Sequence, residues 1–339
     1  MTIKRVLITG ITGMVGSHLA DFIFESTNWE IYGLIRWRSP LENLQNLMSK
    51  EDFESRVKFV YGDLNDVVSI QNIVEESKPD FVFHLAAQSY PQTSFTSGRL
   101  TLDTNINGTY SLLNSLKDFS KKAKIHVCSS SEVFGRVPKE FIPINESTPF
   151  HPASPYAISK VGTDLVAKYF SEAYSMNISI TRMFTHTGPR RGDVFAESTF
   201  AKQIALAEAG LIKPVIKVGN LESLRTIADV RDAVRAYYML LTVNPQGGEY
   251  YNIGGKFSLK IGELLDYLIS ISTVKSDLSI ELDETRIRPI DADLQVPNTA
   301  KFENHTGWKP EIPFEQTMLD LLNFWREKVK NEGNNFLCR

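Results

Sequence analysis

Residues 5–20 read RVLITGITGMVGSHLA, in which an apolar run, Arg5 to Thr9, passes into the glycine-rich turn Gly10-Ile-Thr-Gly-Met-Val-Gly16. The residues after Gly16 have the spacing of an apolar helix. Glycines at a strand-to-helix turn allow a tight bend and expose the helix N-terminal amides to a pyrophosphate, although an ordinary turn is the alternative. The predicted dinucleotide contacts of this turn are Gly10, Thr12, Gly13, Met14, Val15 and Gly16.

Short β-branched runs alternate with segments of helical spacing through the first half of the chain. Such alternation is typical of βαβ units, whose parallel sheet is covered by helices on both faces. The sequence therefore predicts an α/β fold with a doubly wound parallel (Rossmann) sheet. The expected strands are Arg5 to Thr9, Glu30 to Ile35, Val57 to Val60, Phe81 to Leu85, Lys124 to Ser129 and Ile178 to Arg182.

Past about residue 185 the alternation loosens, because prolines interrupt shorter elements. We expect a smaller C-terminal lobe there, which closes over the carboxyl ends of the strands, where open α/β sheets bind their ligands. The predicted division is a coenzyme-binding domain over residues 1–184 and a mainly substrate-binding lobe over residues 185–332. The two are expected to interleave.

The composition excludes several classes of protein. The 339 residues are 42% hydrophobic and 23% charged, as in globular chains. A net charge of −3 provides no basic field for nucleic acid or anionic lipid. No apolar run has the roughly 18 residues of a membrane helix, and no signal peptide is recognisable. Two cysteines cannot form a disulfide framework and lack metal-ligand spacing, so we expect a cytoplasmic protein without a metal site.

The end of the second expected strand bears on the coenzyme. In dinucleotide-binding folds an acid at this point selects NAD, whereas an arginine accommodates the 2′-phosphate of NADP. Here Ile35 is followed by Arg36-Trp37-Arg38-Ser39, without an acid, which favours NADP bound by Arg36, unless the arginines are solvated. After the third strand, Asp63 and Leu64 are expected beside the adenine, although Asp63 could equally cap the next helix.

A candidate proton-transfer pair begins a long amphipathic helix. Tyr156 and Lys160 are four residues apart and therefore share one face of that helix. An ammonium group nearby favours the phenolate, so we expect Lys160 to lower the pKa of Tyr156 and make it a base for a substrate hydroxyl. Taken alone this spacing is common in surface pairs; its position after the glycine turn gives it weight.

A serine run, Ser129-Ser-Ser131, precedes Glu132 at the end of the fifth strand. If the extended conformation persists, Ser130 and Glu132 lie on the same side and can face a ligand. A carboxyl group beside Tyr156 would add proton chemistry beyond hydride transfer. For Ser129 and Ser131 we prefer the alternative, which is capping of the turn.

This ordered set of motifs resembles the extended short-chain dehydrogenase/reductase superfamily. The resemblance covers nearly the whole chain and implies that Leu85, Ala86 and Ala87 also line the coenzyme site. It is carried by Gly10/Gly13/Gly16, Asp63, Leu85-Ala-Ala87, Asn105, Ser130, Tyr156, Lys160 and the C-terminal Thr306-Gly-Trp-Lys-Pro310.

Within that superfamily the chain is most similar to GDP-mannose 4,6-dehydratases and their GDP-heptose relatives. The segments concerned include His84 to Ser89, Ser154-Pro-Tyr156, Gly188-Pro-Arg-Arg-Gly192, Val218 to Arg225 and Arg288-Pro289. The resemblance implies that Lys202, Arg225 and Arg288 hold the nucleotide diphosphate and that Asp291 meets the guanosine ribose. The residues it implies for the substrate are Ser89, Ser130, Glu132, Thr185, Lys202, Val218, Arg225, Arg288 and Asp291.

The implied activity is dehydration of a GDP-sugar, GDP-mannose or GDP-manno-heptose, to the 4-keto-6-deoxy sugar nucleotide for glycan synthesis. Ser130, Glu132, Tyr156 and Lys160 would be catalytic, NADP would be retained through the cycle, and a homotetramer or homodimer is implied. The alternatives are an NADPH-dependent 4-keto-sugar reductase, an epimerase, or a catalytically silent coenzyme-binding regulator. The chain departs from the family's sequence pattern at two places that bear on the identity of the sugar. Thr185 stands where the family usually has Asn, and the segment Thr226-Ile-Ala228 after Arg225 differs from that of the family.

Overall fold

The computed structural model describes residues 3–288, 290 and 292–333. Its central sheet has seven parallel strands in the order β10-β6-β5-β4-β1-β2-β3, which is the predicted doubly wound parallel sheet. The six predicted strands agree with the structure to within one residue at each end. They are β1 (Arg5–Thr9), β2 (Glu30–Ile35), β3 (Val57–Tyr61), β4 (Phe81–His84), β5 (Lys124–Cys128) and β6 (Asn177–Met183).

Successive apolar residues of the strands serve two separate cores. In β1, Val6 and Ile8 pack in the core that contains α1 and α10, whereas Leu7 packs in the core that contains α4, α7 and α8. This alternation follows from the strand period of two, and it explains why the strands are apolar throughout. The helices that flank the sheet are α1 (Met14–Ser26), α4 (Val67–Ser77), α7 (Gly108–Phe119), α8 (Pro155–Tyr174), α10 (Val230–Thr242) and α12 (Ala300–Thr306).

Short helices complete this part of the chain. Two of them follow β2, and the other two follow β4 and lead into α7. They are α2 (Gln45–Met48), α3 (Phe53–Arg56), α5 (Pro91–Thr96) and α6 (Gly98–Leu102).

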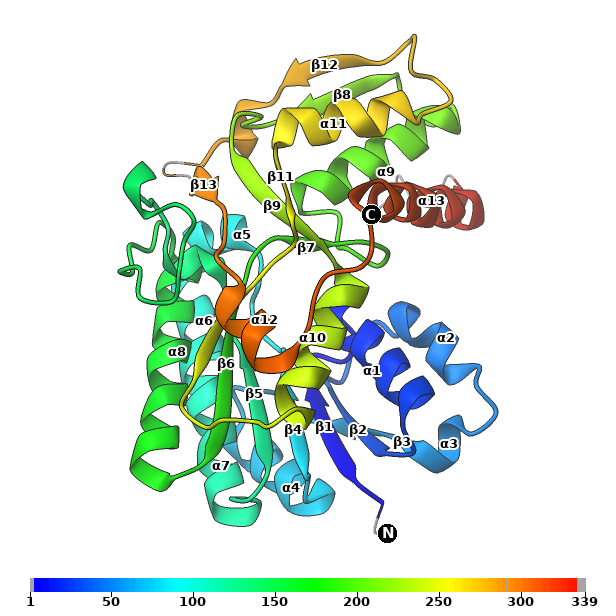
Figure 1. Ribbon diagram of the computed structural model, residues 1–339. Coiled ribbons are helices and arrows are strands. Elements are labelled where there is room, and N and C mark those ends of the chain that lie inside the picture. The colour runs from blue at the N-terminus through cyan, green and yellow to red at the C-terminus, as the bar shows by residue number, and fades with distance from the viewer. Residues whose placement is uncertain (1–2, 289, 291, 334–339) are drawn as a thin grey trace.

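A second group of elements lies beyond the carboxyl ends of the sheet strands (Figure 1), around its own apolar core. It contains a small sheet in which β9 pairs with β7, β11 and β13, and the pair β8 and β12. Its helices are α9 (Ala196–Glu208), α11 (Ile261–Ser270) and α13 (Phe314–Glu332). Its strands are β7 (His186–Thr187), β8 (Val215–Val218), β9 (Leu224–Asp229), β11 (Phe257–Lys260), β12 (Ser279–Leu282) and β13 (Leu294–Gln295).

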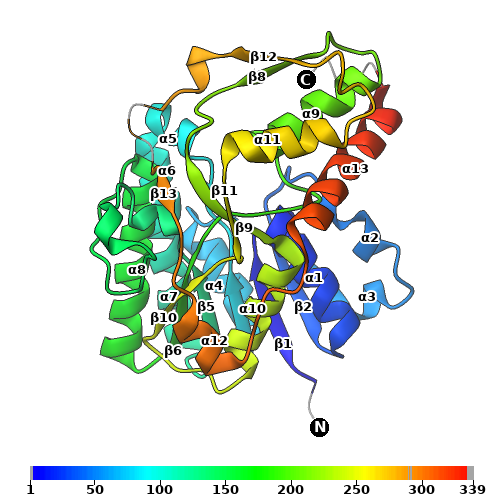
Figure 2. The same ribbon diagram turned by 45° about the horizontal axis from the view of Figure 1, so that its top comes forward.

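The chain crosses between the two groups more than once. After β9 it returns through α10, which packs against α1, and through β10 (Tyr250–Ile253), which pairs with β6 at the edge of the large sheet. Figure 2 shows α10 and α12 near one another on the same side of that sheet. The division at residue 185 stays a prediction. Among the described residues, no helix is both long and apolar enough to cross a membrane.

Candidate active site

The glycine turn between β1 and α1 is packed too closely for side chains. Gly10 has a φ of +74°, and a Cβ on Gly16 would lie 2.2 Å from the carbonyl oxygen of Gly10. Gly13 precedes α1, and no side chain of a described residue caps the helix there. The first amides of α1 are therefore free to bind an anion such as a pyrophosphate. The absence of side chains at Gly10 and Gly16 lets the backbone turn closely enough to fit a dinucleotide.

The loop after β4 packs against this turn. The Thr9 hydroxyl accepts hydrogen bonds from the amides of Leu85 and Ala86, each at 3.1 Å, and it contacts Nδ1 of His84 at 2.8 Å. A Cβ on Gly10 would lie 2.8 Å from the amide nitrogen of Ala86. β1 and β4 are neighbours at which the strand order reverses, which is where doubly wound sheets bind their coenzyme.

A hollow of about 690 Å³ lies at the end of β2. Its lining includes Arg36, Arg38 and Asp63, as a 2′-phosphorylated ribose and an adenine would require. The alternative role of Asp63 as a helix cap is wrong, because Asp66 caps α4 by accepting from the amide of Val68. Asp63 instead accepts from the backbone and side chain of Asn65, and the neighbouring Leu64 is buried in the core.

Tyr156 and Lys160 lie in the first turns of α8, which begins at Pro155 and is capped by Ser154. Both side chains are buried, and the Lys160 ammonium group donates to the carbonyl oxygen of Cys128 at 2.8 Å. Its nitrogen is 6.0 Å from the centre of the Tyr156 ring. The strand end thus holds Lys160 beside Tyr156 through a backbone atom.

The predicted lowering of the Tyr156 pKa is wrong for this structure. Burial raises the pKa of Tyr156, because it disfavours the charged phenolate, and burial likewise lowers the pKa of Lys160. The Ser130 side chain, as a hydrogen-bond partner, and the charge of Arg191 act in the opposite direction on the Tyr156 pKa. Lys160 is turned toward Cys128, so its influence on the phenol is smaller than the spacing suggested.

The backbone at Ser130 and Glu132 has a different conformation from the predicted one. The strand ends at Cys128, and Ser131–Val133 form a 3₁₀ turn, so the extended conformation does not continue to Glu132. Ser130 caps this turn by accepting from the amide of Glu132 at 3.2 Å. The prediction that these two side chains share a site is consistent with the influence of both on the Tyr156 pKa.

Two arginines complete the surroundings of this cluster. Arg288 reaches the Glu132 carboxylate from the segment after β12, with 4.0 Å between Nη1 and Oε2. Arg191, which the sequence does not single out as a site residue, lies over the ring of Phe195 and donates to Glu197 at 3.1 Å. The sequence signal for Arg191 was the Gly188-to-Gly192 run, but no pattern in that run indicates which arginine faces Tyr156.

The remaining predicted substrate residues are distributed over several elements. Ser89 is exposed after β4, Thr185 precedes β7 and is half-buried, and Val218 is buried at the end of β8. Arg225 is buried in β9 and donates to the carbonyl oxygen of Ala292. Lys202 lines a separate pocket of about 220 Å³ with Arg190, Arg191 and Lys328, and it pairs with Asp193 at 2.7 Å. Asp291 lies outside the described residues.

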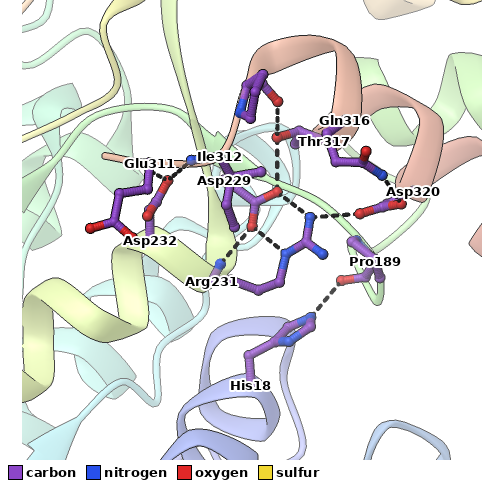
Figure 3. Close-up of polar contacts among 11 residues, drawn as sticks. His18, Pro189, Asp229, Arg231, Asp232, Glu311, Ile312, Gln316, Thr317 and Asp320 are labelled. Atoms are coloured by element: carbon purple, nitrogen blue, oxygen red, sulfur yellow. Dashed lines mark hydrogen bonds and ion pairs between the residues drawn. The ribbon is translucent and has the colours of Figure 1, made fainter. Parts of the chain in front are cut away.

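A polar junction joins α1 to the C-terminal elements (Figure 3). Arg231 bridges Asp229 and Asp320 at 2.7 Å each, and Thr317 donates to Asp229. His18 donates from Nε2 to the carbonyl oxygen of Pro189 at 3.1 Å, and burial lowers the His18 pKa to about 4. The His18 bond, together with the ion pair of Arg190 with Asp21 at 2.7 Å, holds the turn that carries Arg191 against α1.

No group of three or more His, Cys, Asp or Glu side chains among the described residues could hold a metal ion. The donor set around Tyr156 consists of a buried phenol, an ammonium group, a hydroxyl and a carboxylate. Such a set can transfer protons at two positions of one ligand.

Comparison with known proteins gives matches over nearly the whole chain. A family model described as GDP-mannose 4,6 dehydratase matches residues 7–321. The GDP-mannose 4,6-dehydratase of Vibrio cholerae serotype O1 is 30% identical, over 95% of this chain and 93% of its own. The GDP-6-deoxy-D-mannose reductase of Pseudomonas aeruginosa is also 30% identical, over 97% and 99%. The solved structure of RMD from Pseudomonas aeruginosa complexed with NADPH has a TM-score of 0.80 and 29% identity, over 96% and 100%.

Proposed function

The chain belongs to the GDP-mannose 4,6-dehydratase family, and we propose that it is an NADP-dependent hydro-lyase that converts a GDP-sugar to its 4-keto-6-deoxy form. The observation that carries this proposal is the carboxylate of Glu132 in the same site as Tyr156 and Lys160. Oxidation of a hydroxyl needs only the tyrosine and the lysine. Elimination of water also needs a second base, and Glu132 is that base.

The coenzyme site fits NADP. The amides of α1 would receive the pyrophosphate, and Arg36 would receive the 2′-phosphate in the hollow after β2. When bound there, NADP would supply the hydride acceptor for C4 and the hydride donor for C6. Arg36 stands where an NAD-selective acid would otherwise stand.

Different residues of this chain transfer the protons of the two steps. Tyr156 takes the proton of the C4 hydroxyl, assisted by Ser130 and by the positive charge of Arg191. The ketone at C4 acidifies the C5 hydrogen, so oxidation must precede elimination. Glu132 then accepts the C5 proton and returns a proton to the hydroxyl that leaves C6 as water. A hydride added at C6, together with the proton held by Tyr156 and given to C5, then forms the methyl group at C6 and leaves the ketone at C4.

The experiment that tests this function uses the purified protein without added coenzyme. We expect GDP-mannose to lose one water, as measured by product mass, and we expect the protein to retain NADP. A GDP-manno-heptose assayed in parallel decides between hexose and heptose, for which we propose GDP-mannose because of the family match. No loss of water from either substrate would exclude the dehydratase.

A second candidate is favoured by one observation. The reductase of Pseudomonas aeruginosa is as similar as the dehydratase and aligns over 99% of its own length. A reductase would share Tyr156 and Lys160, would leave GDP-mannose unchanged, and would consume added NADPH with the 4-keto-6-deoxy sugar nucleotide. The same assay therefore separates the two functions.

We also propose a homodimer, formed through α7 and α8. Three large side chains of α8, Ile158, Leu165 and Tyr169, are exposed along one stripe, and Tyr110 of α7 is exposed beside them. Leu165 is 59% exposed, and large apolar side chains exposed on one face of a helix are typical of an interface. Leu165→Glu should yield monomers in light scattering after gel filtration; unchanged mass would exclude this interface.

The cellular setting follows from the same proposal. We propose that the protein acts in the cytoplasm, where nucleotide sugars would be available, and supplies a deoxy-sugar precursor for glycan synthesis. Fractionation of the source cells tests the location. Recovery of the protein outside the cytoplasm would contradict it.

A further inference from the structure

A buried ion pair lies next to the proton-transfer residues. Asp164 follows Lys160 by one turn of α8, and Arg182 lies in β6. Nε of Arg182 donates to Oδ2 of Asp164 at 2.8 Å, and the two side chains are only 5% and 4% exposed. The proposed reaction uses neither residue, and a buried ion pair is seldom worth more to stability than apolar side chains of the same volume. Its position beside Lys160 indicates a role in the site.

Lys160 is a buried cation whose hydrogen-bond acceptor carries no charge. Its ammonium group donates to the carbonyl oxygen of Cys128 at 2.8 Å, and the residue is 5% exposed. Burial of an ammonium group favours loss of its proton, and it lowers the pKa of Lys160. An anion nearby would oppose this loss.

The neighbouring histidines cannot supply that anion. His84 of β4 and His126 of β5 are both buried close enough to Lys160 for its charge to act on them. Burial lowers the pKa of each to about 3, and the charge of Lys160 acts in the same direction. Both rings are therefore neutral, and neither one is a counter-charge for the ammonium group.

Two further neighbours become negative only when they lose a proton. Cys128 would act on Lys160 as a thiolate, and Tyr156, whose ring centre is 6.0 Å from the Lys160 nitrogen, as a phenolate. Asp164 differs from both. Burial raises its pKa, but the charge and hydrogen bond of Arg182 oppose this, and a neutral Asp164 would leave a guanidinium group without a counter-charge in the core. The pair is therefore ionised, and Asp164 is the described anion that acts on Lys160.

We propose that Asp164 is a positioning residue: it supplies the negative charge that keeps the buried Lys160 as an ammonium group, and Arg182 holds it in place. The helix period puts residues 160 and 164 on one face of α8. Arg182 is itself fixed, because its Nη1 donates to the carbonyl oxygen of Glu146 at 2.8 Å and its guanidinium group lies 4.4 Å from the ring centre of Tyr250. The consequence for turnover rests on the proposed function, in which Lys160 belongs to the site.

The first test measures the charge of Lys160 without any turnover. In protein labelled with ¹³C at the Cε of lysine, the NMR shift of each lysine reports the protonation of its Nζ. The signal that is absent from Lys160→Met belongs to Lys160. It should show a charged amine at pH 7 in the wild type. In Asp164→Asn its titration midpoint should fall by at least about one pH unit, because an opposite charge within about 4 to 6 Å changes a pKa by about one to three pH units.

Matched variants separate the charge of Asp164 from its packing. Asp164→Glu keeps the charge and should retain most of the wild-type midpoint. Asp164→Asn combined with Arg182→Gln leaves no unpaired guanidinium group in the core, and it should still lower the midpoint if the single variant fails to fold. Glu172→Gln is the control, because it removes an exposed carboxylate that pairs with Lys168 on the same helix at 3.2 Å, and it should leave Lys160 unchanged. Circular dichroism verifies the fold of each variant.

Two results would overturn the proposal. One is an uncharged Lys160 at pH 7 in the wild type. The other is an equal midpoint in the wild type and in a folded variant that lacks the Asp164 carboxylate.

A second test follows the pH dependence of water loss. The alkaline limb of kcat/KM reports groups of the free protein that must be protonated. It should move to lower pH by at least about one unit in Asp164→Asn, because Lys160 then loses its proton earlier, and it should return in Asp164→Glu. A limb that does not move in a folded Asp164→Asn would overturn the consequence for turnover. Absence of any water loss from GDP-mannose would instead exclude the proposed function, while the NMR titration would still decide the role of Asp164.

Discussion

Replacement of Glu132 by Gln should separate oxidation from elimination with little effect on folding. The amide has nearly the shape of the carboxylate, and the hydrogen bond from the Glu132 backbone amide to Ser130 does not depend on the side chain. The variant therefore keeps the 3₁₀ turn and removes one proton acceptor.

The expected magnitudes follow from the surroundings of the carboxylate. Its ion pair with Arg288 is long, at 4.0 Å, and both side chains are partly exposed, so its loss should change the free energy of unfolding by no more than about 1 kcal/mol. Loss of a general base costs about 10²- to 10⁴-fold in rate. Water loss should therefore collapse by that factor while the fold is unchanged.

Three measurements test this expectation. Product mass follows water loss, absorbance of the reduced nicotinamide follows oxidation at C4, and urea denaturation follows stability. Glu140→Gln, an exposed glutamate in the turn after Val137, is the matched control and should behave as the wild type. In deuterated water the wild-type product should carry deuterium at C5 and keep at C6 the hydrogen that began at C4.

Two outcomes would refute the reasoning. Full water loss by Glu132→Gln would show that another group removes the C5 proton. A C6 hydrogen drawn from added coenzyme would exclude the internal hydride return on which the dehydratase depends.

Further substitutions address the coenzyme, the nucleotide and the buried histidines. Arg36→Asp should lower the affinity for NADP about ten- to a hundredfold and change the affinity for NAD little, because charge-assisted bonds to phosphate contribute about 1.5–3 kcal/mol. Fluorescence titration measures both affinities. An equal loss of affinity for the two coenzymes would show that Arg36 has a structural role. Gly16→Ala places a methyl group 2.2 Å from the Gly10 carbonyl oxygen and should cost about 1–3 kcal/mol of stability as well as coenzyme affinity, so an unaffected melting curve would contradict the turn geometry. Arg225→Lys should lower affinity for GDP about tenfold, and wild-type affinity in calorimetry would remove Arg225 from the nucleotide site. Burial lowers the pKa of His126 to about 3, so the unfolded protein binds a proton at this residue at a higher pH than the folded protein does. The free energy of unfolding should therefore fall as the pH drops below about 6.5, by up to about 2 kcal/mol at pH 5. His126→Asn should reduce the slope of the free energy of unfolding in urea against pH, and an unchanged slope would contradict this assignment.

The strands and the glycine turn were predictable because their signals are local. The run Arg5–Thr9 is apolar at every inner position, and it needs both faces covered whatever lies around it. Gly16 is required by contacts with Gly10 and Ile11 of the same turn, so its spacing carries the information, whereas Gly10 is required by its φ of +74° and also by Ala86, which lies after β4. The pair Tyr156 and Lys160 was likewise placed by the helix period.

Several features of the site depended on contacts between distant parts of the chain. The Tyr156 pKa is set by burial under elements that the helix spacing does not describe, and Lys160 is turned aside by the carbonyl group of Cys128. Glu132 lies in a 3₁₀ turn and not in a strand, because β5 ends at Cys128, where its pairing with β6 ends. None of these has a periodic signal in the sequence.

The sequence by itself therefore determined the strands of the sheet, the glycine turn and the placement of Tyr156 and Lys160 in one helix, since each rests mainly on residues near one another in the chain. Only the tertiary structure decided that β10 returns to the edge of the large sheet, that Arg191 approaches Tyr156, and that Arg288 pairs with Glu132. The physical reason is that a charge acts through space over a few ångströms, and the residues that come so close are separated by up to about 150 positions of chain, over which no local pattern extends.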